Sequence, residues 1–232
     1  MPILKRDLLT ITETDIPRLA KSGEELLSQK FAQSAELYNR ILHSSRDDLA
    51  SDELIEHVYD MLIAFGMNSQ KAKMSELLDF TKLIQKHADT IQSLAKLKLE
   101  EIEENDNAFK TTIDSLFSAL EGITQTISTL GTFSKTMHFL LPDLFIPISR
   151  KNTLQFYYAD MPFNRERKMQ HVIDSGEKQR ECLEQVFDDF RQFAQKRYEI
   201  LKAQVDKTSC WNRNIPKVID NILIAYVSEK ME

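Results

Sequence analysis

The side chains best suited to chemistry lie in one segment that two prolines divide. Lys135 and His138 are three residues apart, so they share one face of the helix that this part of the sequence predicts. Pro142 and Pro147 then fix a stiff turn, which is expected to bring Arg150 back toward that face. A lysine, a histidine and an arginine repel one another unless an anion lies among them. The spacing therefore predicts an anion-binding pocket.

The predicted pocket draws on both limbs of this turn. The expected ligand-binding residues are Ser134, Lys135, His138, Arg150 and Lys151. Thr132 or Ser134 is expected to cap the helix, and Pro142 is expected to end it. A purely structural interpretation stays open, in which His138 is a core histidine bonded to a backbone carbonyl and Lys135 is a surface lysine.

A second cluster mixes basic side chains with aromatic rings. Between positions 149 and 171 the sequence has five basic residues against two acidic ones, on a chain whose net charge is −6. Basic groups neutralise phosphates and aromatic faces stack on bases, so this composition is typical of single-strand binding sites. The residues expected to contact nucleic acid are Tyr157, Tyr158, Arg165, Arg167 and Lys168. The alternative is that the rings belong to the core and that the cations are solvated or pair with the acidic half of the chain. A pI near 5.5 argues against a general DNA-coating role.

The proline-bounded segment resembles a group of uncharacterised bacterial helical proteins. In that group a serine-lysine pair is followed by a histidine, then by a proline, an acidic residue and a leucine, and finally by a second proline and an Asp-Arg pair. The residues that match this pattern are Ser134, Lys135, His138, Pro142, Asp143, Leu144, Pro147, Arg150 and Thr153. The resemblance covers about 25 of the 232 residues and implies no activity.

More remotely, the succession of helix, proline-bounded loop and second helix is similar to that of the helix-hairpin-helix DNA glycosylases. The catalytic aspartate of those enzymes follows such a loop, and Ser149 stands where it would be expected in this sequence. A serine cannot supply the carboxylate that stabilises an oxocarbenium-like centre or activates water. The glycine-rich hairpin of those enzymes is also not visible. The resemblance thus implies a related fold without the glycosylase chemistry.

Sequence patterns for other chemistries are missing. The five histidines are scattered, and neither a Glu-x-x-His pair nor a glycine-rich phosphate loop nor a Gly-x-Ser-x-Gly elbow occurs. Cys182 and Cys210 are too few and too far apart for a metal or redox motif, so both are expected to be reduced thiols. We therefore expect neither a metal nor a cofactor.

Composition predicts the fold class. The chain is 42% hydrophobic and 28% charged, with only 5 glycines and 6 prolines. Many strands and tight turns would need more of both, so we expect an all-α multi-helix bundle with long amphipathic helices and a proline-bounded motif segment. No apolar run approaches the ~20 residues of a membrane span, and no secretory signal is recognisable, which predicts a soluble, cytoplasmic protein.

The spacing of apolar residues locates the helices. Helices are expected over 15–41 with Asp15 as its cap, over 51–65 with Gly66 as its stop, over 75–104, from about 107, from 176 to about 201, and from 216 with Asn214 as its cap. The predicted core face of the helix that begins near 107 is Phe109, Ile113, Leu116, Phe117 and Leu120. At most a short strand is expected, over Leu8–Thr12. Residues 1–130 and 131–232 are expected to pack as one domain.

Three classes of function fit these observations. The first is a helical binding module that holds a phosphate-bearing ligand or nucleic acid at residues 132–171. The second is a protein-protein interaction or regulatory protein, in which the motif is purely structural. The third is an enzyme or, following the remoter resemblance, a DNA-glycosylase-like fold without its catalytic aspartate. The sequence leaves the oligomeric state open.

Overall fold

The structure is a computed structural model that describes residues 6–68, 73–126, 129–158 and 175–231. Helix accounts for 69% of it and no strand occurs in these residues, so the predicted all-α multi-helix fold is confirmed. The nearest approach to strand pairing is an isolated bridge between Met74 and Thr124. Among the described helices, none combines the length and the apolar character that a membrane span requires.

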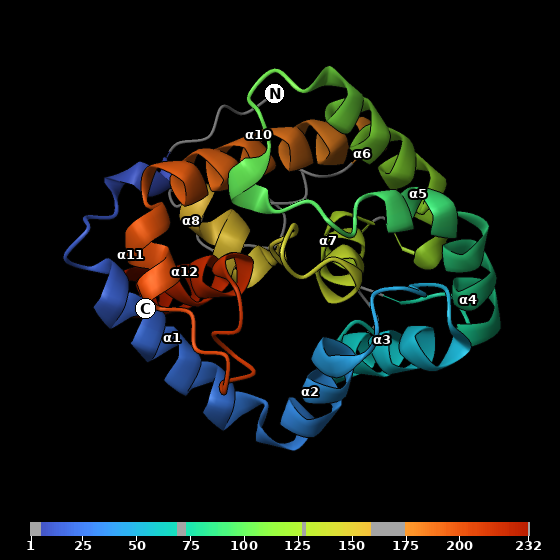
Figure 1. Cartoon of the computed structure of the whole chain (residues 1–232), viewed down its shortest axis with the longest axis horizontal. Coiled ribbons are helices and arrows are strands. Elements are labelled where there is room, and N and C mark those ends of the chain that lie inside the picture. The colour runs from blue at the N-terminus through green and yellow to red at the C-terminus, as the bar shows by residue number, and fades with distance from the viewer. Residues whose placement is uncertain (1–5, 69–72, 127–128, 159–174, 232) are drawn as a thin grey trace.

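Figure 1 shows how the helices follow one another along the chain. The α-helices are α1 (Ile16–Lys30), α2 (Ala35–His43), α3 (Asp52–Ala64), α4 (Leu77–Lys86), α5 (Ala88–Ser93), α6 (Asn107–Ala119), α7 (Thr129–Leu140), α8 (Gln155–Tyr157), α10 (Gly176–Lys196), α11 (Tyr198–Ala203) and α12 (Ile215–Met231). The shorter elements are the 3-10 helices η1 (Leu8–Thr10), η2 (Ala32–Ser34), η3 (Leu99–Glu101) and η4 (Glu121–Ile123) and the π-helical turn η5 (Arg150–Leu154).

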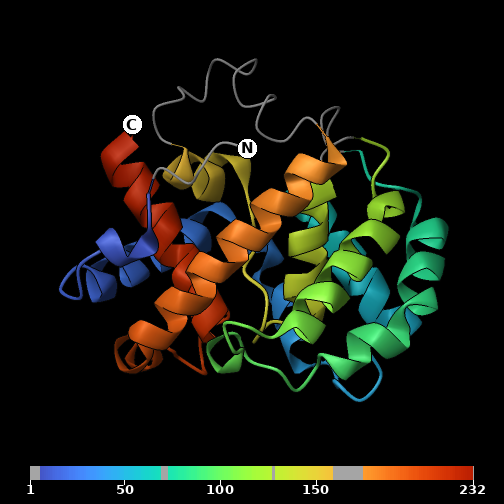
Figure 2. The same ribbon diagram turned by 90° about the horizontal axis from the view of Figure 1, so that it is seen from above.

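Helix α7 forms the centre of the molecule. All of its residues are buried except Gly131 and Lys135. Helix α10 crosses the molecule with α12 on one side and α6 and α7 on the other (Figure 2). Buried residues from before and after position 131 form one hydrophobic core.

Helices α1 and α12 pack along each other at short range. At Gly23, an added Cβ would lie only 2.0 Å from the carbonyl oxygen of Asn221. Any larger residue would push the two helices apart, so the crossing requires glycine.

The described part of the N-terminal region forms no strand, and its first long helix is interrupted. The sequence permits a strand over Leu8–Thr12, but η1 forms there, because the Asp7 carboxylate accepts a hydrogen bond from the backbone N–H of Leu9 and so stabilises a turn. The single helix predicted over 15–41 breaks at Phe31, where φ is −118°, and the chain continues through η2 into α2.

The long helix predicted over 75–104 is wrong. The chain leaves helical geometry at His87, where φ is −111°, and ends its second helical piece, α5, at Ser93. The backbone N–H of Leu99 then donates to the carbonyl of Asp143, 3.0 Å away in the loop after α7. This tertiary contact ties the chain to the core, which local helical propensity cannot reveal.

Other expectations for the helices are confirmed. Gly66 follows α3 with φ of 77°, the left-handed conformation that favours glycine. The side-chain oxygen of Asn214 accepts a hydrogen bond from the backbone N–H of Lys217 and caps α12. The predicted core face of α6 is buried at Phe109, Ile113, Leu116, Phe117 and Leu120.

The helix that carries the motif begins earlier than predicted. Helix α7 starts at Thr129, so Thr132 and Ser134 lie inside it and neither caps it. Its end at Leu140, just before Pro142, agrees with the predicted stop.

Candidate functional site

His138 is part of the core and has partners on both ring nitrogens. Its Nδ1 lies 2.7 Å from the carbonyl oxygen of Phe145, and its Nε2 lies 2.8 Å from the hydroxyl of Tyr38. Burial, and after it the charge of the nearby Lys217, lowers the pKa of His138 to about 3. In the neutral ring Nδ1 donates to the carbonyl and Nε2 accepts from the tyrosine. An anion would find neither a positive charge nor a vacant donor on His138, which corrects its prediction as an anion ligand.

Ser134 joins α7 to the chain that returns after Pro147. Its Oγ accepts a hydrogen bond of 2.9 Å from the backbone N–H of Ile148, and it lies 3.3 Å from the carbonyl of Gly131. The next serine, Ser149, accepts a hydrogen bond from the backbone N–H of Asn152 and so begins η5. Both hydroxyls therefore have structural roles.

The three predicted basic ligands lie in different surroundings. Lys135 points toward the end of α3, where its Nζ lies 2.9 Å from the sulfur of Met67. Burial lowers the pKa of Lys135 to about 8. Arg150 begins η5, which packs against α12 and α8, and its Nε is buried without a hydrogen-bond partner among the described residues. Lys151 is exposed.

The two tyrosines predicted to contact nucleic acid belong to the core. The hydroxyl of Tyr157 donates to Asp189, 2.6 Å away, and that of Tyr158 lies 3.7 Å from the sulfur of Cys182. Both side chains are buried, so no base can stack on them, and their prediction as stacking residues is corrected in favour of the core alternative. The other predicted contacts lie outside the described residues, at Arg165, Arg167 and Lys168.

Between α12 and its neighbours lies a set of polar residues, all buried except the half-buried Glu24, which we call the polar seam. Its members are Glu24, Asn212, Lys217, Asp220 and Asn221. Lys217 forms an ion pair with Asp220, and both are almost fully buried. The ammonium group of Lys217 also lies 5.8 Å from the centre of the Trp211 ring.

The amide groups of the polar seam hold the loop before α12. The Nδ2 of Asn221 donates to the side-chain oxygen of Asn212 at 2.7 Å, and the Nδ2 of Asn212 donates to Glu24 at 2.6 Å. Glu24 also accepts a hydrogen bond from Ser209. These bonds use most of the hydrogen-bond donors and acceptors of the seam. The seam therefore joins α1, α12 and the loop, and it offers few groups to a ligand.

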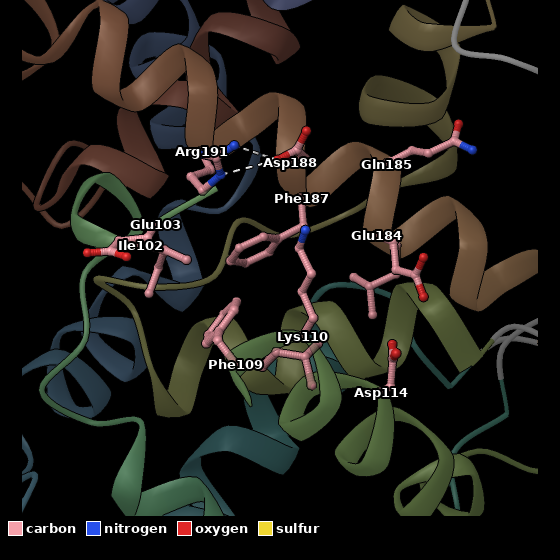
Figure 3. A pocket seen from close by; sticks show the side chains of 12 residues that line it. Ile102, Glu103, Phe109, Lys110, Asp114, Glu184, Gln185, Phe187, Asp188 and Arg191 are labelled. Atoms are coloured by element: carbon pink, nitrogen blue, oxygen red, sulfur yellow. Dashed lines mark hydrogen bonds and ion pairs between the residues drawn. The ribbon is translucent and has the colours of Figure 1, made fainter. Parts of the chain in front are cut away.

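A pocket of about 250 Å³ opens between α6 and α10 (Figure 3). Its lining combines an apolar floor with a charged rim. The apolar lining residues are Ile102, Phe109, Ile113, Leu183 and Phe187, and the polar ones are Glu103, Lys110, Asp114, Glu184, Gln185, Asp188 and Arg191.

Aromatic rings shape the floor of this pocket. Phe109 of α6 and Phe187 of α10 meet with their ring centres 5.4 Å apart, and Phe187 also packs on Phe145 at 5.6 Å. The floor therefore packs against the core through Phe145, which follows α7 in the chain.

Two carboxyl groups face each other on the rim. Asp114 of α6 and Glu184 of α10 point toward one another in Figure 3. The pKa of Glu184 is raised, first by partial burial and then by the nearby carboxylate of Asp114. Two ionised carboxylates that face each other in this way repel each other.

The arginine of the rim is already neutralised. The guanidinium group of Arg191 is buried and bonds Asp188 at 2.7 and 3.1 Å and the side-chain oxygen of Gln195 at 2.9 Å. In Figure 3 the side chain of Lys110 runs toward Phe187, and the pair of Asp114 and Glu184 lies to one side of it. Among the described polar lining residues, the Asp114–Glu184 pair is thus the main negative charge that faces the pocket without a bonded cation.

The sequence contains only part of the signal for this pocket. Phe109 and Ile113 are predicted core residues of α6, and Leu183 and Phe187 follow the apolar stripe of α10. The missing information is the contact between two helices about 70 residues apart along the chain, and periodicity within one helix cannot supply it.

The described residues contain no cluster of histidine, cysteine, aspartate and glutamate that could hold a metal ion. Comparisons of the chain with protein-family models, with curated proteins and with solved structures gave no match. The function must therefore be argued from the geometry of the chain itself.

Proposed function

We propose that this protein is a helical binding protein that takes a small, largely apolar ligand into the pocket between α6 and α10. The observation that carries the proposal is an apolar hollow at the surface, floored by the paired rings of Phe109 and Phe187. Pockets with a hydrophobic lining and a few polar groups are the usual form of small-molecule sites.

The dimensions limit the ligand. At about 250 Å³ the pocket lies just below the usual range for small-molecule sites, which begins near ~300 Å³. It accepts one aromatic ring or one branched alkyl group with a short arm. Burying such a group against Ile113, Leu183 and Phe187 contributes roughly 25 cal/mol for each Å² of apolar surface removed from water.

Methyl NMR spectroscopy tests this proposal directly. We expect 2-phenylethanol to shift the methyl signals of Ile102, Ile113 and Leu183 in a saturable manner. The methyl groups of Ile55 and Leu62, which are buried in α3, serve as the control and are expected not to move. Shifts that are absent, or that extend equally to α3, contradict the proposal.

A second candidate function keeps the phosphate-bearing ligand or nucleic acid predicted at residues 132–171. It is favoured by the buried Nε of Arg150, which has no hydrogen-bond partner among the described residues, and by the exposed Lys151 beside it. Phosphate is then expected to raise the melting temperature of the wild type more than that of an Arg150→Ala/Lys151→Ala variant. An equal increment in both would mean that phosphate acts only by exclusion from the surface.

A further inference from the structure

The rim of the α6–α10 pocket indicates which ligands it selects. This inference rests on the proposed function, because it concerns the ligand of the same pocket. The apolar floor accepts many small groups, so selectivity has to come from the polar groups at its edge. Among these groups Asp188 and Arg191 are bonded to each other, which leaves Asp114 and Glu184 as the pair that a ligand can engage.

The carboxyl pair needs a positive charge between its members. Asp114 and Glu184 approach each other from two helices, and the nearby negative charge of Asp114 helps to raise the pKa of Glu184. A protonated amine between two carboxylates offsets their mutual repulsion, and it has several N–H bonds to donate. The nearest basic groups do not take this position. Arg180 influences Glu184 only through its charge while its guanidinium donates to Ser118, and Lys110 runs toward Phe187.

We propose that the ligand is an amphipathic amine, whose ring or alkyl group fills the apolar floor and whose ammonium group donates hydrogen bonds to Asp114 and Glu184. The floor begins beside these carboxyl groups, since Ile113 precedes Asp114 and Leu183 precedes Glu184 in the lining. A short chain between the apolar group and the nitrogen of the ligand is enough to reach from the apolar floor to the carboxyl pair. Hydrogen bonds that involve two charged partners are stronger than neutral ones, so the amine is favoured over a neutral molecule of equal shape.

The test compares three probes of one shape and different charge. Calorimetry on the full chain at pH 7.5 measures the affinities of 2-phenylethylamine, 2-phenylethanol and 3-phenylpropionate. We expect the amine to bind at least about tenfold more tightly than the alcohol, and the carboxylate to bind most weakly. The preference for the amine is expected to fall as sodium chloride is added, because the rim is solvated.

Charge-neutral variants locate the interaction. Asp114→Asn and Glu184→Gln are each expected to remove most of the preference for the amine and to leave the affinity for the alcohol within about twofold. Glu199→Gln, an exposed glutamate on α11 outside the pocket, is the matched control and is expected to keep the full preference.

The outcomes separate this inference from the function on which it rests. Equal affinities of amine and alcohol, with both shifting the methyl group of Ile113, would overturn the inference and leave the proposed function in place. Retention of the amine preference in both pocket variants would overturn it as well. If neither probe binds, both the inference and the proposed function fail.

Discussion

The polar seam and the α6–α10 pocket place carboxylates in opposite situations. In the seam, Asp220 is almost fully buried and paired with Lys217. In the pocket, Glu184 is exposed and faces another acid, Asp114. The charge of Asp220 is therefore neutralised inside the protein, whereas the two like charges of the pocket can be neutralised by a cation from outside.

The same distinction explains why Ser134 and His138, predicted as ligand-binding residues, have structural roles instead. The chemically suggestive residues Ser134 and His138 are bonded to the backbone at Ile148 and Phe145, within the same segment. Their hydrogen-bonding capacity serves the turn itself. Polar residues in a short stretch of sequence can thus stabilise a turn as well as form a binding site. The two cases are distinguished by how many hydrogen-bond donors and acceptors remain without a partner in the folded protein.

The largest expected effect is in the seam, from Asp220→Ala. The change leaves the ammonium group of Lys217 buried without its partner, and breaking such a pair costs about 3–5 kcal/mol of the free energy of unfolding. Urea unfolding monitored by circular dichroism measures the loss. An Asp220→Ala/Lys217→Met variant is expected to recover much of it, because the unpaired charge is removed. A loss below about 1 kcal/mol in the single variant would show that the pair is not isolated from water.

A smaller loss is expected from Tyr38→Phe. The change removes the hydroxyl that donates to Nε2 of His138 and leaves that nitrogen buried without a partner, which costs about 1–3 kcal/mol. Tyr59→Phe is the control, since its hydroxyl donates to the carbonyl of Ser75 from a partly buried position, and it is expected to cost less. Urea unfolding compares the two, and equal losses would contradict the assignment of His138 to the core network.

The sequence predicts the helices well where a helix is bounded by its own residues. Gly66 and Asn214 mark helix ends that depend on local backbone geometry, and both are visible in the sequence. The departure from helix before Leu99 is not visible, since Leu99 bonds to a loop more than 40 residues later. The same limit applies to the pocket, since apolar periodicity identifies each lining helix but not which acids meet across the two.

An intermediate effect on stability, dependent on pH, is expected at the N-terminal turn. Asp189 of α10 accepts hydrogen bonds from the backbone N–H of Leu8 at 3.0 Å and from the hydroxyl of Tyr157 at 2.6 Å. Burial is the main cause that raises its pKa to about 6, and Asp7 raises it too. The folded state therefore holds a proton that the unfolded state releases from about pH 4, so stability falls by roughly 1–2 kcal/mol as the pH rises from 4 to 7.

The variant Asp189→Asn isolates this contribution. The amide oxygen can still accept from Leu8 and Tyr157, while the titrating group is gone. We expect the stability of the variant, measured by urea unfolding between pH 4 and 7, to lack that part of the decline. A decline of unchanged size would mean that other carboxyl groups cause it.

The smallest effect is expected in the pocket, from Glu184→Gln, and its sign is opposite to that of the change in the seam. Burial and Asp114 raise the pKa of Glu184, so its ionised form destabilises the fold above its unfolded pKa, and the cost disappears on acidification. Because the group is largely solvated, we expect the variant to be more stable than the wild type by only a few tenths of a kcal/mol at pH 7 and equal to it near pH 4. Glu199→Gln is expected to change nothing at either pH. A loss of stability at pH 7 would show that Glu184 forms a favourable interaction within the protein. Its charge would then already be neutralised, and the pocket would have no unpaired carboxylate for a cationic ligand.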